Sequence, residues 1–151
     1  MSNEKLQDHD QAVVAEIEKD LRYMSGIIKQ KGREILSNYT ITPPQFIALQ
    51  WLFEEGDMTI GALSQKMYLA CSTTTDLIDR MEKNKLVMRV KDPNDRRVVR
   101  INLLQKGKKL IEEVIWKRQE YLQKTLRHYS SEEILHLKET LNKLHHEMKK
   151  D

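Results

Sequence analysis

Cysteine, proline, glycine and aromatic residues are all scarce in this sequence, and each scarcity excludes a class of protein. A single cysteine, Cys71, excludes an internal disulfide and fits a reducing, cytoplasmic setting. Three prolines, five glycines and 6% aromatic residues favour a mainly helical chain with a modest core. No apolar run approaches the roughly 20 residues that span a bilayer, and the N-terminus lacks a signal-peptide core. The sequence predicts one domain over residues 1–151, with no membrane segment.

Groupings of reactive side chains are also missing from the sequence. Among the five histidines, His136 and His145 do not share a helical face, and no cysteine or carboxylate cluster completes a zinc set. No nucleophile–base pair, glycine-rich phosphate loop or cofactor fingerprint appears. The sequence therefore predicts neither an enzyme nor a protein that carries a metal or cofactor.

The middle of the chain contains two short helical patterns followed by two strands. Residues 59–67 and 72–85 have apolar residues at helical spacing. Residues 87–91 and 98–102 alternate as strands on either side of a polar turn that contains Pro93 and Asn94. This order is that of a winged helix-turn-helix, expected over about residues 42–103. In such a module the second helix enters a DNA major groove and the hairpin tip, or wing, reaches the neighbouring minor groove.

Capping residues predict four helix starts. The side-chain oxygen of a capping residue accepts from amides left unpaired in the first helical turn. Two of the starts also have a Gln or Glu three residues on, which completes a capping box. The predicted caps are Thr42 with Gln45, Thr59, Ser72, and Ser130 with Glu133.

Positive charge is concentrated on the predicted winged module. Between Arg80 and Lys109, eleven Lys or Arg stand against three acids, a net of +8. The whole chain carries only +3, so the remaining residues together carry −5. Such an asymmetry favours a local polyanion site over charge spread for solubility.

The side chains expected to contact DNA lie at the start of the second short helix and on the wing. Hydroxyl groups at a helix N-terminus reach bases and phosphates, and the free amides there favour phosphate oxygens. An acid on the wing can orient a neighbouring arginine through a charge-assisted hydrogen bond. The candidates are Ser72, Thr73, Thr74, Thr75, Arg80, Asp95, Arg96 and Arg97.

Long helices are expected on both sides of this module, over about residues 9–37 and 105–151. The first has an apolar stripe too long to be buried entirely within a small domain. The last part of the second, from Ser130 onward, repeats apolar residues at coiled-coil spacing. Its members are Ile134, Leu137, Leu141, Leu144 and Met148. These stripes predict dimerisation helices.

Four segments together resemble the MarR family of bacterial transcriptional regulators, from about Leu21 to the C-terminus. They are residues 42–46, 59–67, 78–87 and the wing 92–97, and the Asp-x-Arg of the wing (Asp95, Arg97) is the most specific of these features. One departure is Leu104, where the family usually has a threonine before the next helix.

The resemblance implies an obligate homodimer that binds a pseudo-palindromic operator in double-stranded DNA, most often as a repressor. It implies that Arg97 inserts into the minor groove. It further implies a pocket for a small aromatic or lipophilic acid as effector, between the winged module and the dimer helices. Residues expected near such a pocket are Met24, Ile28, Phe46 and Trp51.

Two alternatives stay open from the sequence. The winged module could bind an acidic protein partner, as an adaptor. Cys71, beside a helix N-terminus that lowers a thiol pKa, could make the regulator redox-responsive. The favoured interpretation of Cys71 is a small buried apolar residue.

Overall fold

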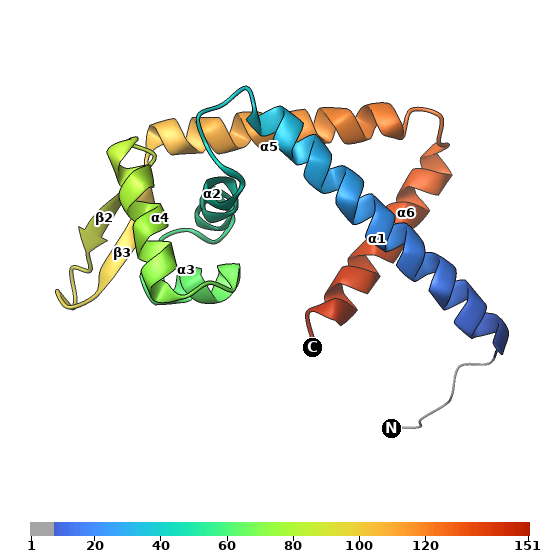
Figure 1. The fold of residues 1–151 in the computed structure, drawn as a ribbon, viewed down its shortest axis with the longest axis horizontal. Helices are drawn as coiled ribbons and strands as arrows, with labels where there is room; N and C mark the ends of the chain where they lie inside the picture. The colour runs from blue at the N-terminus through green and yellow to red at the C-terminus, as the bar shows by residue number, and fades with distance from the viewer. Residues whose placement is uncertain (1–7) are drawn as a thin grey trace. The chain divides into compact units, whose positions relative to one another are not determined.

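The computed structural model describes residues 8–151, with side chains from Asp10 onward, and contains six helices and one small sheet in that range (Figure 1). This confirms the predicted, mainly α-helical winged-helix fold class. The chain divides into two compact units, Met1–Val114 and Ile115–Asp151. In chain order the elements are α1 (Asp8–Leu36), α2 (Pro43–Glu55), β1 (Met58–Thr59), α3 (Ile60–Met67), α4 (Cys71–Lys83), β2 (Val87–Lys91), β3 (Val99–Leu103), α5 (Gln105–Thr125) and α6 (Ser131–Met148). None of the helices described here combines the length and apolar character needed to cross a membrane.

Three of the four predicted caps form as expected. The hydroxyl of Thr59 accepts from the Ala62 amide at 3.1 Å. Thr42 and Gln45, and likewise Ser130 and Glu133, form complete capping boxes at the starts of α2 and α6. Local sequence therefore fixes where these helices begin.

The prediction that Ser72 caps the second short helix is wrong. The N-cap of α4 is Ala70, whose side chain makes no capping hydrogen bond, and the helix begins at Cys71. The turn after α3 is so short that Ser72 already lies inside the first helical turn. Its hydroxyl therefore belongs to the outer surface of the helix start.

The three strands form an antiparallel sheet in the order β1-β3-β2. In the β2–β3 hairpin, Val87 pairs with Leu103 and Lys91 with Val99, while Met58 of β1 pairs with Ile101. The third strand, β1, is absent from the sequence prediction because two residues show no alternation. By pairing with β3, it ties the base of the wing to the helices of the module.

A single apolar core holds the winged module together. Leu63 of α3, Ile78 and Met81 of α4, and the strand residues Val87 and Ile101 are fully buried. The start of α5 contributes further buried residues, Ile111 and Val114. α4 and the base of the wing therefore share this core.

Gly107 lets α5 pass very close to the backbone between α4 and β2. A Cβ atom there would overlap the carbonyl oxygen of Leu86 and lie 3.1 Å from its carbonyl carbon. The same carbonyl accepts from the Leu104 amide at 3.0 Å, and Lys106 Nζ donates to the Asn84 carbonyl at 3.0 Å. Only a residue without a side chain fits this crossing.

Gly107→Ala should therefore lower the free energy of unfolding, by about 1–3 kcal/mol, because backbone must shift to make room. Urea unfolding at fixed protein concentration measures the change. Gly61→Ala is the matched control, since the nearest atom to its added Cβ is the Thr59 hydroxyl at 4.0 Å. Equal unfolding midpoints for the two variants would contradict the close contact.

Both terminal helices expose apolar stripes. On α1, Val13, Ile17, Met24 and Ile28 are all exposed. No residue of α6 is buried within the single chain, although it carries the predicted seam. Exposed apolar stripes of this kind are typical of helices that pack against another chain.

Candidate nucleic-acid interface

Helix α4 presents the beginning of its outer face to solvent. Thr74, Ile78 and Met81 recur at helical spacing and are buried, so the opposite side of the helix faces outward. Ser72 and Thr73 are exposed, and so is Arg80 further along the helix. Among the predicted hydroxyl contacts, Ser72 and Thr73 are therefore the most accessible.

Thr75 is only partly exposed. Its hydroxyl donates to the carbonyl of Cys71 at 2.9 Å. This bond uses the donor but leaves the lone pairs of the oxygen able to accept from a ligand. Thr75 therefore remains a candidate contact.

Two predictions about this helix start are wrong. Thr74 is fully buried, and its hydroxyl donates to the Ala70 carbonyl at 3.2 Å, so it cannot reach a base edge. Its position four residues before Ile78 was the signal that placed it on the core face. Cys71, predicted to be buried, is exposed because it is the first residue of α4.

The tip of the wing, residues 92–98, is held by hydrogen bonds among its own residues and by one from Arg100 of β3. The Oδ1 atom of Asp92 accepts from the Asn94 amide at 2.8 Å, and its Oδ2 accepts from Arg100 Nε at 3.0 Å. The amide of Asn94 and then the Arg100 guanidinium hold the pKa of Asp92 below its ordinary value. The amide of Asp92 also donates to the Val98 carbonyl at 2.8 Å, which closes the turn.

In the middle of this turn Asp95 accepts hydrogen bonds from Arg97. Arg97 Nε donates to Asp95 Oδ1 at 3.1 Å, and the Arg97 amide donates to the same oxygen at 3.1 Å. Hydrogen bonds from the Arg97 side chain and then from its amide hold the pKa of Asp95 below its ordinary value. The Arg97 side chain is nevertheless 91% exposed, and the adjacent Arg96 is exposed as well. The predicted charge-assisted bond is present, and it holds an accessible guanidinium at the wing tip.

Arg89 connects the wing to α4, a role that the sequence did not reveal. Its guanidinium donates to Asp79 and, at 2.9 Å, to Glu82 Oε1, and its amide donates to Glu82 Oε2 at 2.9 Å. Partial burial opposes the charged form, but the hydrogen bonds to Asp79 and Glu82 outweigh it and raise the pKa of Arg89. A strand arginine facing two helix acids across the module can be found only once the packing is known.

These ion pairs determine which side chains carry the net positive charge of residues 80–109. The three acids between Arg80 and Lys109, namely Glu82, Asp92 and Asp95, each pair with an arginine. Among the described residues the other eight cations of the segment have no acid partner. They are Arg80, Lys83, Lys85, Lys91, Arg96, Lys106, Lys108 and Lys109. The net of +8 is thus carried by side chains available to a polyanion.

The residues expected near an effector pocket fall into two groups. Met24 and Ile28 are exposed on α1, whereas Phe46 and Trp51 are half-buried on α2. The ammonium group of Lys66, on α3, lies 5.0 Å from the centroid of the Trp51 ring. Cation–π geometry of this kind places a positive charge beside an aromatic surface.

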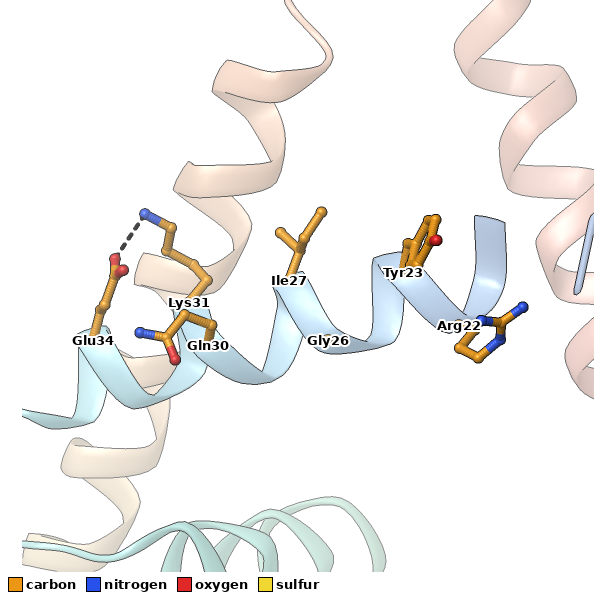
Figure 2. Close-up of a pocket in the computed structure, with 7 residues that line it drawn as sticks. All are labelled: Arg22, Tyr23, Gly26, Ile27, Gln30, Lys31 and Glu34. Atoms are coloured by element: carbon orange, nitrogen blue, oxygen red, sulfur yellow. Dashed lines mark hydrogen bonds and ion pairs between the residues drawn. The ribbon is translucent and has the colours of Figure 1, made fainter. Parts of the chain in front are cut away.

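A shallow hollow lies along α1 (Figure 2). Tyr23, Ile27 and Lys31 point toward the same side of the helix there, and Lys31 pairs with Glu34 at 3.0 Å. All of its lining residues come from this one helix: Arg22, Tyr23, Gly26, Ile27, Gln30, Lys31 and Glu34. Met24 and Ile28 do not line this hollow, so it is not the predicted pocket.

Comparison with known proteins gives consistent matches over this fold. The sequence model of the MarR family matches residues 41–99, which cover α2 to the start of β3. The chain is 67% identical to the uncharacterized HTH-type transcriptional regulator YsmB of Bacillus subtilis (strain 168) over 137 residues, 91% of this chain and 94% of that protein.

Solved structures agree with these matches. A MarR family protein from Bacillus stearothermophilus has a TM-score of 0.88 and 62% identity, over 92% of this chain and 97% of that one. A point mutant of S. aureus MepR, solved bound to an oligodeoxyribonucleotide, has a TM-score of 0.64 and 27% identity, over 87% of this chain and 97% of that one.

Proposed function

Because the chain belongs to the MarR family of transcriptional regulators, we propose that it binds a pseudo-palindromic DNA operator as a homodimer and represses transcription there. The relatives are DNA-binding regulators and not enzymes, and they lend no support to the adaptor or redox alternatives. Since its target is chromosomal DNA, we place the protein in the cytoplasm.

The observation that carries this proposal is the shared surface of α4 and the wing. Ser72, Thr73 and Thr75 stand at the helix start, where they could meet base edges in the major groove. Arg97, held by Asp95 and exposed at the wing tip, could enter the minor groove. Arg80 and Arg96 would contact phosphates and fix the register of the module on the duplex.

Dimerisation would come from the exposed stripes of α1 and α6. One winged module makes few contacts, so its affinity for DNA is low. Two modules joined in a symmetric dimer bind two half-sites, and the second engages at high effective concentration. Burying the apolar stripes against their copies would remove them from water.

The test is the binding of the dimer to duplex DNA from upstream of its own coding region, measured by fluorescence anisotropy across salt concentrations. With about four phosphate contacts per module, the logarithm of the association constant should fall by about 7 for each tenfold rise in salt. Binding as tight to random duplex of equal length, or a slope near zero, would contradict the proposal.

We also propose that a small aromatic acid is the effector and that Lys66 and Trp51 hold it. The ammonium of Lys66 would pair with the carboxylate, and the half-buried Trp51 ring would pack against the aromatic group. Binding there would favour a dimer conformation in which the distance between the two α4 helices no longer matches the distance between the operator half-sites. A coupling of the usual size lowers operator affinity by roughly 5- to 150-fold.

Benzoate and 4-hydroxybenzoate are suitable probes for this effector site. At saturation, either compound should quench Trp51 fluorescence in a Trp116→Phe background and release the operator fragment. Lys66→Met should abolish both responses while leaving the Trp51 ring in place. Release of DNA that is unaffected by Lys66→Met would place the effector elsewhere.

A further inference from the structure

Tyr68, in the turn between α3 and α4, combines a left-handed backbone with almost complete exposure. Its φ and ψ angles are 55° and 40°, and the residue is 96% exposed. A left-handed backbone disfavours residues with a Cβ atom, which is why glycine usually ends a helix in this way. The exposed ring has almost no protein surface against it, so packing does little to offset the strain.

The backbone of this turn is nevertheless held firmly. The Tyr68 amide donates to the Gln65 carbonyl at 3.3 Å, and the Leu69 amide donates to the Ser64 carbonyl at 3.0 Å. Ser64 is itself buried, so the turn is anchored to the core. Tyr68 therefore stands at a fixed place, three residues before the first residue of α4.

The stretch of sequence on both sides of Tyr68 carries no acidic residue. Residues 68–73 are all exposed, and they form one continuous strip that runs from the turn into the start of α4. The sequence has no Asp or Glu between Asp57 and Asp76, and Lys66 is the only charged residue in that interval. No carboxylate of this segment would repel a phosphate that approaches the strip.

We propose that the phenol of Tyr68 donates a hydrogen bond to a DNA phosphate at the edge of the groove that α4 enters. This inference rests on the proposed operator binding by α4. A phosphate is favoured over a base, because the residue precedes the helix and would lie over the rim of the groove. Tyr68 would thus be a positioning residue that fixes the depth and angle of the helix start.

Two substitutions separate this role from a structural one. Tyr68→Gly removes the phenol and the backbone strain, so we expect the melting temperature to rise by roughly 4 °C. The same variant should bind duplex DNA roughly 10- to 100-fold more weakly, because the dimer loses two charge-assisted hydrogen bonds. Tyr68→Phe keeps the ring and the backbone but loses the same two hydrogen bonds, so it should leave the melting temperature unchanged and weaken DNA binding by the same factor of roughly 10- to 100-fold.

Binding is measured on the upstream duplex and on a random duplex, with Tyr129→Phe as the matched tyrosine control. A phosphate contact predicts a similar loss on both duplexes. A loss confined to the upstream duplex would mean a base contact and would overturn the assignment to phosphate. Wild-type affinity of both variants would overturn the inference while the proposed function stands, whereas no selective binding by the wild-type protein would overturn the proposed function itself.

Discussion

Arg97→Ala is expected to reduce the affinity of the dimer for its operator by roughly 100-fold, because each of the two wings loses a contact that contributes about tenfold. The physical reason is the geometry of the wing tip. Asp95 holds the Arg97 guanidinium through Nε at 3.1 Å, while the side chain remains 91% exposed. An arginine fixed in this way enters the groove with little further loss of conformational freedom.

Arg97→Lys tests whether the positive charge at this position is enough for DNA binding, or whether the geometry of the guanidinium is also needed. Lysine retains the positive charge but cannot reproduce the paired donors that face Asp95. The affinity of the Arg97→Lys variant for the operator should therefore lie between that of the wild type and that of Arg97→Ala. Arg96→Ala should lower the affinity for the operator by less than Arg97→Ala does. Arg96 has no acid partner among the described residues, so no ion pair orients its side chain. Operator affinity unchanged by Arg97→Ala at physiological ionic strength would refute the assignment of the wing.

Leu141→Glu should convert the dimer into a monomer and lower operator affinity by roughly 10²- to 10⁴-fold, through the lost effective concentration of the second module. Leu141 lies in the middle of the α6 seam and is exposed in the single chain. In a symmetric dimer the substitution places two glutamates in an apolar interface, where an unpaired charge is strongly unfavourable. Analytical ultracentrifugation and DNA binding measure the two effects on the same sample.

Lys143→Gln is the control for this variant, because it changes the net charge by the same amount from the opposite face of α6. It should remain dimeric and bind DNA close to the wild-type level. A dimeric Leu141→Glu with full affinity would show that α6 does not supply the interface. Correct folding of the monomer is checked by its helical circular dichroism.

The parts of the fold predicted correctly were those with local signals. Capping boxes at Thr42 and Ser130 marked helix starts because the bonding partners lie only three residues apart. The wing was recognisable from alternation and turn residues, and its Asp95–Arg97 bond spans two positions. Membership of the MarR family and a regulatory function, also predicted, are confirmed by the relatives.

The features that could not be predicted from the sequence depend on packing between helices and strands. Thr74 is polar, but its position in the helical repeat places it in the core, where its hydroxyl donates to the Ala70 carbonyl. Arg89 looked like one more basic residue until the hairpin placed it against Asp79 and Glu82. The backbone of Tyr68 could not be inferred because that position normally favours glycine.

Hydroxyl-radical footprinting on the DNA upstream of the coding region tests the central claim most directly. A symmetric pair of winged modules should protect two half-sites whose centres lie about one helical turn, roughly 10–10.5 base pairs, or a multiple of it apart. Flanking minor-groove protection should disappear in Arg97→Ala. A single unpaired protected site, or protection spread evenly along the fragment, would contradict the account.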